Sequence, residues 1–207
     1  MDKHIVINIG RQLGSGGREI GKIIAEKLNI AFYDKNLIDL ASQESGLSKS
    51  CFEKADEKAS GGVLGSFFAM HYPYSGYAGT NNVMSNDSLF KIQSDVIKEL
   101  ANKQSCIFVG RCADYVLRNN PDATSIFISC PKEERLKRIS KRHNISIEEA
   151  EDMSVKTDKG RAQFYNYYSY KTWGAARTYD LCINSALFGI DGTAEFIISY
   201  LKKKFDI

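Results

Sequence analysis

The sequence predicts one three-layer α/β/α domain built on a five-stranded parallel sheet. Short apolar runs alternate with longer amphipathic stretches along the 207 residues, and this alternation is typical of a sheet covered by helices. The short runs are apolar on both faces, as expected for strands that helices bury on each side. A chain of this length can form one buried core with small insertions.

Four strands are expected from clear apolar runs, and a fifth from the weaker run Ala31–Asp34. The clear runs are Ile5–Ile9, Cys106–Val109, Ser125–Ser129 and Leu181–Ile183. Helical patterns lie between and after them, at Gly17–Leu28, Lys35–Ser45, Ser88–Asn102, Pro131–His143, Ser146–Tyr168 and Gly189–Phe205. The helix after Ser146 should begin with a capping box, because Glu149 follows Ser146 by three residues.

Composition narrows the class of protein. Hydrophobic residues make up 43% and charged residues 26% of the chain, as in globular rather than disordered proteins. The net charge of +3 is too small to require a nucleic-acid partner. No apolar run reaches the ~20 residues that span a bilayer, and the opening run is too short for a signal peptide. Five cysteines without a CxxC pair suit a reducing compartment and no metal site, so we expect a cytoplasmic protein.

A glycine-rich turn between the first strand and the first helix is the strongest chemical signal. It reads Gly10-Arg11-Gln12-Leu13-Gly14-Ser15-Gly16-Gly17-Arg18-Glu19. Glycines in such a turn let successive backbone N–H groups point inward and bind anionic oxygens at a helix N-terminus. We expect donor phosphates to be bound here, by Arg11, Gly14, Ser15, Gly16, Gly17, Arg18 and Glu19. A glycine-rich turn that binds no phosphate is the alternative.

This turn departs from the P-loop pattern GxxxxGK[ST]. With Gly16 as the last glycine, Gly17 takes the lysine position and Arg18 the hydroxyl position. With Gly17 as the last glycine, Arg18 replaces the lysine and Glu19 replaces the hydroxyl that holds Mg²⁺. Arg11 or Arg18 is expected to supply the missing positive charge, because guanidinium groups bind phosphate well. The residues that hold a metal are not identified by this pattern.

Three arginines on one predicted helix form a candidate lid over the nucleotide. Arg135, Arg138 and Arg142 recur at i, i+3 and i+7, so they share a helix face. Such a face can neutralise charge that develops on a transferring phosphoryl group. We expect Arg138 to be catalytic and Arg135 and Arg142 to bind the donor. The alternative is a solvated face on which Glu133 and Glu134 pair with the arginines.

The next predicted helix carries Asp158 and Arg161, which lie one helical turn apart. The carboxylate can orient the guanidinium group toward an anion. Both residues are expected to be catalytic, and Arg161 is also expected to bind the acceptor. The aromatic stretch Phe164–Tyr168 follows and is either core or a platform for a base.

Charged residues also follow two of the predicted strands, at the edge where doubly wound sheets bind ligands. Arg111 and Asp114 come after Cys106–Val109, and Asp34 ends the weaker second strand. We expect these three residues to bind the acceptor, with strand-end caps as the alternative. The segment Ser60–Asn82 interleaves glycines with aromatic residues and is an insertion, a substrate-covering lid or an oligomer contact.

The order of these motifs resembles cytidylate kinases, and more closely the bacterial cytidylate-kinase-like proteins. The segments that carry the resemblance are Gly14-Ser15-Gly16, Gly110-Arg111, Asp158-Lys159-Gly160-Arg161-Ala162 and Tyr179-Asp180-Leu181 with Asn184-Ser185. They are similar to the family's phosphate loop, its Gly-Arg-Asp motif, its Asp-x-x-Arg-Ala motif and its last strand. Cys112 stands where the family has the aspartate of Gly-Arg-Asp.

This resemblance implies a P-loop NTPase fold and transfer of the γ-phosphoryl group of ATP to CMP or dCMP with Mg²⁺. It implies that Arg111 contacts the acceptor phosphate and that Asp158 and Arg161 bind the acceptor and stabilise transfer. The core would comprise residues 1–34, 103–131 and 178–207, with an acceptor-side insertion at about 35–102 and a lid region at about 132–177.

Two other functions remain open at this stage. The altered phosphate loop suits a nucleotide-binding protein without kinase activity, and the acceptor side suits a kinase of a different small metabolite. The expected partners are small-molecule nucleotides, with no nucleic acid and no membrane; a homo-oligomer is left open.

Overall fold

The structure is a computed structural model that describes residues 3–36 and 86–206. Most of the helix predicted at Lys35–Ser45, and all of Ser60–Asn82, lie outside the described residues. By its internal contacts the chain divides into two units, Met1–Lys35 with Lys98–Ile207, and Asn36–Ile97. The sheet and the candidate site described below belong to the first unit, whereas most of the helix at Asn86–Lys103 belongs to the second.

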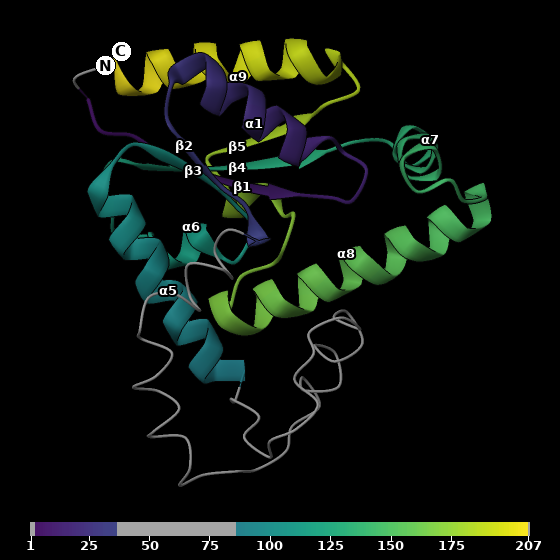
Figure 1. Cartoon of the computed structure of the whole chain (residues 1–207), viewed down its shortest axis with the longest axis horizontal. Helices are drawn as coiled ribbons and strands as arrows, with labels where there is room; N and C mark the ends of the chain where they lie inside the picture. Colours follow the sequence, from purple (N-terminus) through teal and green to yellow (C-terminus); the bar gives the residue numbers. More distant parts are fainter. Residues whose placement is uncertain (1–2, 37–85, 207) are drawn as a thin grey trace, which may run out of the picture. The chain divides into compact units, whose positions relative to one another are not determined.

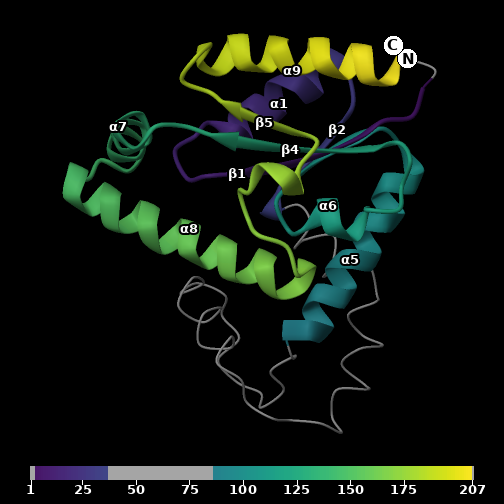
Figure 2. The same ribbon diagram turned by 180° about the vertical axis from the view of Figure 1, so that it is seen from behind.

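A five-stranded parallel sheet forms the centre of this unit (Figures 1 and 2). Its strands are β1 (Val6–Arg11), β2 (Ala31–Tyr33), β3 (Cys106–Val109), β4 (Ala123–Ser129) and β5 (Leu181–Asn184), in the order β2-β3-β1-β4-β5. The predicted sheet is therefore confirmed. Strand β1 runs two residues past its apolar run, because Gly10 and Arg11 pair with Phe127 and Ile128 of β4.

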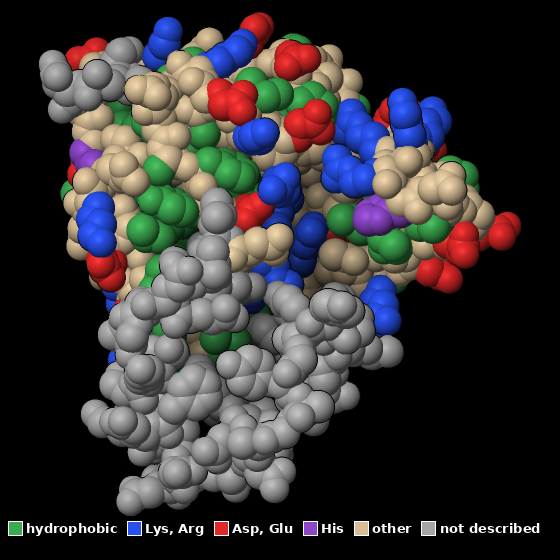
Figure 3. Space-filling model, viewed as in Figure 1, with side chains coloured by type: hydrophobic (Ala, Val, Ile, Leu, Met, Phe, Trp, Pro, Cys, Tyr) green, Lys and Arg blue, Asp and Glu red, His purple; other side chains and the backbone are tan. Residues whose placement is uncertain are grey.

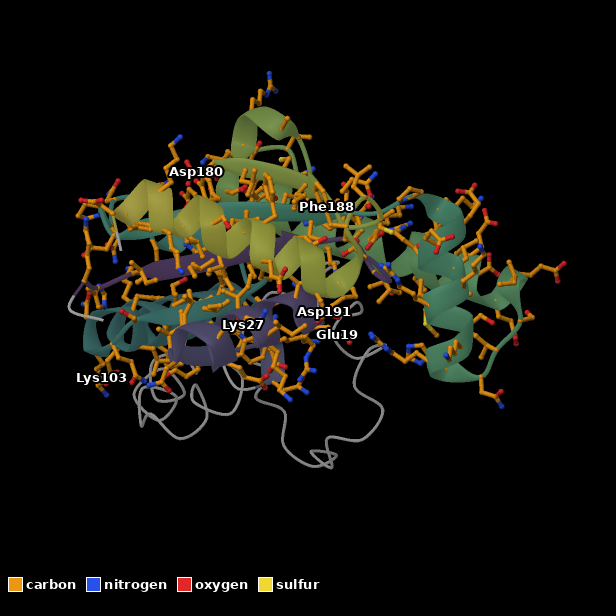
Figure 4. All side chains as sticks on the ribbon, turned by 90° about the horizontal axis from the view of Figure 1, so that it is seen from above. Glu19, Lys27, Lys103, Asp180, Phe188 and Asp191 are labelled. Atoms are coloured by element: carbon orange, nitrogen blue, oxygen red, sulfur yellow. The ribbon has the colours of Figure 1, made fainter. Side chains whose placement is uncertain are left out.

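Two helices, α1 (Gly17–Leu28) and α9 (Gly189–Phe205), cover one face of the sheet (Figure 1). Isoleucines of β1, β3 and β4 pack there against Ile20 and Ile24 of α1 and Ile197 and Leu201 of α9. Both helices begin at the same edge of the layer, as Glu19 and Asp191 in their first turns show (Figure 4). Their positive N-terminal ends therefore face the same side of the domain.

The remaining helices are α5 (Asn86–Lys103), α6 (Ala113–Val116), α7 (Lys132–His143) and α8 (Ile147–Ser169), with a 3₁₀ turn at Ala176–Thr178. The capping box is confirmed: Ser146 and Glu149 exchange side-chain and backbone hydrogen bonds of 3.1 and 2.8 Å. Helix α7 begins one residue later than predicted, with Pro131 as its N-cap. No helix in the described ranges is both long and apolar enough to cross a membrane.

Candidate active site at the carboxyl edge of the sheet

The glycine-rich turn after β1 forms an open cradle of backbone amides. Gly14 and Gly16 adopt φ angles of +77° and +80°, a left-handed conformation that costs glycine nothing and other residues about 1 kcal/mol or more. The turn leaves the N–H groups of Gly14, Gly16, Arg18 and Glu19 without an acceptor among the described residues. Four unpaired donors at the N-terminus of a helix favour an anion.

This cradle is held in place from three directions. Asp158 Oδ1 accepts the N–H of Leu13 at 2.8 Å, and the Ser185 hydroxyl donates to the carbonyl of Ser15 at 2.7 Å. Gln12 ties the turn to the end of β4, since its side-chain oxygen accepts the N–H of Cys130 at 3.1 Å. Contacts from α8, β4 and the segment after β5 thus preorganise the turn before any ligand binds.

Three arginines line one small pocket beside the cradle. Arg11, Arg111 and Arg161 contribute to the same pocket, which is partly open to solvent. Its other walls are Asn8, Ile9, Gly10, Gly110, Cys112, Asp114, Phe164, Tyr165, Trp173 and Tyr179. Lys and Arg side chains gather over the middle of the face shown in Figure 3 and around α7. The pocket combines positive charge with an aromatic wall.

Electrostatics in this pocket favour a bound anion. Burial, together with the positive charges of Arg161 and Arg111, lowers the pKa of Arg11 to about 9. Burial also lowers the pKa of Arg161, against the attraction of Asp158 and with the repulsion of Arg135. Cations that share a site disfavour one another's charged form. An oxyanion placed among them would relieve this repulsion.

Asp158 on α8 joins the cradle to two arginines. Besides the Leu13 amide, its carboxylate accepts hydrogen bonds from Arg135 Nη1 and from Arg161 Nη1, the latter at 3.4 Å. The Asp158–Arg161 pair expected from the sequence is therefore present. Arg161 Nη1 also donates to the carbonyl of Arg11 at 3.1 Å, while its Nη2 and Nε have no acceptor among the described residues. Part of this guanidinium group is thus available to a ligand.

The three predicted lid arginines are all bonded to the protein. Arg135 pairs with Asp158 and donates to the Ser154 hydroxyl at 2.8 Å, and its side chain is 11% exposed. Arg138 Nη1 lies 3.3 Å from the carbonyl oxygen of Gly14. Arg142 lies 3.8 Å from Glu19, with both side chains exposed. The shared helix face is present, and in this arrangement its arginines hold α7 against the cradle and α8.

Arg18 and Asp34 form a pair on the β2 side of the cradle. Arg18 Nε and Nη2 donate to Asp34 Oδ2 at 2.7 and 2.6 Å, and the guanidinium group lies 6.0 Å from the Phe32 ring centroid. The carboxylate is buried, whereas the Arg18 side chain is 62% exposed. Arg18 is not among the residues that line the arginine pocket.

Asp114, in the first turn of α6, lies at the pocket's aromatic end. The Tyr165 hydroxyl donates to its carboxylate at 2.6 Å, and burial raises the pKa of Asp114 above its ordinary value of 3.8 despite that hydrogen bond. Asp114 reaches the pocket because Gly110, Arg111 and Cys112 all have positive φ, at 88°, 60° and 54°. This conformation is sterically unfavourable for the two non-glycine residues, Arg111 and Cys112, and the run turns the chain sharply into α6.

Sequence reasoning missed several walls of this pocket. Asn8 is 3% exposed and its Oδ1 has no partner in the described ranges; a polar residue inside an apolar strand was the available signal. Trp173 and Tyr179 pack on Phe127 with ring centroids 5.2 and 5.0 Å apart, and no local pattern marks them. Phe164 and Tyr165 line the pocket, whereas Tyr167 of the same stretch is 52% exposed.

Metal-binding side chains are sparse in this site. The described residues contain no group of three or more His, Cys, Asp or Glu that could hold an ion. Mg²⁺ in kinases needs only one or two carboxylates in addition to substrate phosphates. Glu19 is one carboxylate at the cradle, in the first turn of α1.

Comparisons with known proteins agree with this geometry. Residues 6–187 match the cytidylate kinase-like family. A cytidylate kinase from Thermococcus kodakarensis is 34% identical over 95 residues, which are 45% of this chain and 48% of that protein. The chain thus matches about half the length of this curated relative.

Solved structures extend the comparison over almost the whole chain. An uncharacterized protein from Eubacterium ventriosum is 29% identical, with a TM-score of 0.73 and coverage of 96% of this chain and 99% of the other. A shikimate kinase from Bacteroides thetaiotaomicron is 15% identical, with a TM-score of 0.54 and coverage of 96% and 98%. A gluconokinase from Sinorhizobium meliloti is 11% identical, with a TM-score of 0.52 and coverage of 98% and 94%. The fold is that of P-loop kinases.

Proposed function

Because the chain belongs to the cytidylate kinase-like family, we propose that it transfers the γ-phosphoryl group of ATP to CMP, dCMP or a related small acceptor. Family and fold together identify a P-loop kinase that acts on a nucleotide or another small molecule. One observation carries the finer proposal. Arg11, Arg111 and Arg161 line one pocket beside four backbone amides that have no acceptor in the described part of the chain, an arrangement suited to two phosphate groups side by side.

In this proposal the donor phosphates lie on the cradle. The N–H groups of Gly14, Gly16, Arg18 and Glu19 bind their oxygens, and the helix N-terminus adds favourable potential. Mg²⁺, when bound through these phosphates, would neutralise developing charge, and Glu19 would hold it. Arg138 and Arg135 keep α7 closed against the cradle, and Arg142 lies at its exposed edge.

The acceptor lies in the arginine pocket. Arg111 and Arg161 bind its phosphate, and the free Nη2 of Arg161 faces the group being transferred. Asp158 acts as a positioning residue, because it bonds Arg161 and the Leu13 amide at once. Asp114, Asp34 and the aromatic wall contact the sugar or base. Since phosphoryl transfer requires little covalent chemistry from the protein, positioning and charge neutralisation provide most of the rate.

The test is an ADP-release assay with ATP, Mg²⁺ and a panel of acceptors. CMP, dCMP, UMP and AMP form one arm, and shikimate and gluconate form another. We expect turnover with CMP or dCMP and none above background with shikimate or gluconate. Turnover only in the second arm would show that the acceptor is a different small metabolite and not a nucleotide. ADP binding by calorimetry without turnover in either arm would indicate a nucleotide-binding protein without kinase activity.

A further inference from the structure

The side chain of Arg11 occupies space that two glycines leave open. A methyl group on Gly17 would lie 2.6 Å from Arg11 Cβ and 3.1 Å from its Cγ. A methyl group on Gly110 would lie 2.2 Å from Arg11 Nη1 and 3.2 Å from its Cζ. The stem of Arg11 therefore crosses Gly17 at the start of α1, and its guanidinium group lies against Gly110 beyond the end of β3.

Gly17 occupies the position of the P-loop lysine when Gly16 is taken as the last glycine of the pattern. That lysine normally projects from the helix start toward the β- and γ-phosphates. Here the α-carbon at this position carries no side chain, and the stem of an arginine from the preceding strand passes over it. A cation thus enters the same region from the strand side.

The alternative source of charge, Arg18, is already engaged. It binds the buried carboxylate of Asp34 through two nitrogens, at 2.7 and 2.6 Å, and it does not line the arginine pocket. By contrast, no described residue accepts a hydrogen bond from the Arg11 guanidinium group. Its neighbours in the pocket, Arg111 and Arg161, are also cations.

We infer that Arg11 is the functional replacement of the P-loop lysine, and that its guanidinium group contacts the phosphoryl group in transfer. This rests on the proposed kinase function. Gly17 and Gly110 are then required for this placement of Arg11, because a side chain at either position would displace the arginine. Removal of one preorganised cationic donor of this kind lowers turnover by about 10²- to 10³-fold.

The test compares matched variants for ATP binding by calorimetry and for ADP release. Arg11→Met removes the charge and keeps the stem. Arg18→Met tests the other candidate cation of the turn, and Lys22→Met, at an exposed lysine of α1, is the control. The double variant Arg11→Gly/Gly17→Lys places a lysine at the usual position and removes the whole Arg11 side chain, including the Cβ that would lie 2.6 Å from the Cβ of the new lysine. Urea unfolding verifies that each variant is folded. If Arg11→Met does not fold, Arg11→Lys and the double variant are compared with the unmodified protein instead.

We expect Arg11→Met to lose about 10²-fold or more in turnover, Arg18→Met to lose less than Arg11→Met, and Lys22→Met to stay within about threefold of the unmodified protein. The double variant should recover at least about tenfold over Arg11→Gly alone. Arg11→Met with near-normal turnover, or Arg18→Met with the larger loss, would overturn the inference. A double variant no faster than Arg11→Gly would also count against it. If the unmodified protein neither binds ATP nor releases ADP, the proposed function itself fails, which is a separate result.

Discussion

Asp158 Oδ1 accepts the backbone N–H of Leu13 at 2.8 Å, so that a carboxylate on α8 is bonded directly to the phosphate-binding turn. The same side chain receives Arg135 and Arg161. One residue therefore links the cradle, the α7 helix and the acceptor side. Four predictions follow from this network and from the pocket beside it.

Asp158→Asn should destabilise the protein and should also lower its turnover rate. The asparagine amide can still accept the Leu13 N–H. It leaves the largely buried Arg135 side chain without a counter-charge, which lowers the free energy of unfolding by about 1–3 kcal/mol. Turnover should fall by more than the loss of folded protein explains, because Arg161 is no longer held. Urea unfolding and steady-state kinetics measure the two effects. Asp152→Asn, an exposed acid on the same helix, should change neither, and equal losses in both variants would contradict the role.

Arg161→Ala should reduce turnover by about 10²-fold or more while leaving the fold intact. Within residues 3–36 and 86–206, only Nη1 of Arg161 is hydrogen-bonded to the protein, so the rest of the guanidinium group is expected to act on the transferred group. The matched control is Arg177→Ala, at an exposed arginine in the 3₁₀ turn. A rate for Arg161→Ala within a few-fold of the unmodified enzyme would remove the residue from the mechanism.

Arg11→Met should stabilise the protein in the absence of nucleotide, by about 1 kcal/mol. The pKa of Arg11 falls from 12.5 to about 9 on folding. The folded state therefore disfavours the cation at all pH values below about 9, and this cost disappears only as the pH rises from about 9 toward 12.5. Unfolding in urea at pH 7 measures the gain. ATP should raise the midpoint of the unmodified protein more than that of the variant; the reverse order would speak against an anion site.

Asp114→Asn should flatten the pH dependence of stability in a window that begins near pH 3.8, the ordinary pKa of this carboxyl group. Burial raises the pKa of Asp114 in the folded state above 3.8, so the folded protein binds this proton more tightly than the unfolded chain does. The unfolding free energy should then fall as the pH rises through this window, with a slope of at most about 1.4 kcal/mol per pH unit from one group. Urea titrations of both proteins at several pH values measure the difference. Identical pH profiles would show that the carboxyl group titrates normally.

The fold was largely predictable because each strand is an apolar run that helices bury on both sides. The errors have local causes. The apolar pattern of β1 stops at Ile9, whereas pairing with β4 continues to Arg11. Helix α6 has only four residues and follows two left-handed non-glycine residues, which no periodicity reveals. The capping box was predicted correctly because its two partners lie three residues apart in the sequence.

The site was predictable only in part, because its contacts join residues far apart in the chain. Helical spacing placed Arg135, Arg138 and Arg142 on one face, but it could not show that Asp158, Gly14 and Glu19 already bind them. The choice between Arg11 and Arg18 stayed open in the sequence for the same reason. Asp34 is 16 residues from Arg18, and Gly110 is 99 residues from Arg11, so only the folded chain brings these pairs together.

The left-handed backbone at Cys112 also bears on which residues the chain can accept there. Aspartate, the residue of the related Gly-Arg-Asp motif, tolerates this conformation better than most side chains do. Cys112, however, is 4% exposed, and burial together with the charge of Asp114 raises the pKa of its thiol. A second acid at this position would place two carboxylates in one enclosed space, where like charges repel. In this protein Asp114 lies two residues further along the chain, and the uncharged thiol of Cys112 avoids that repulsion.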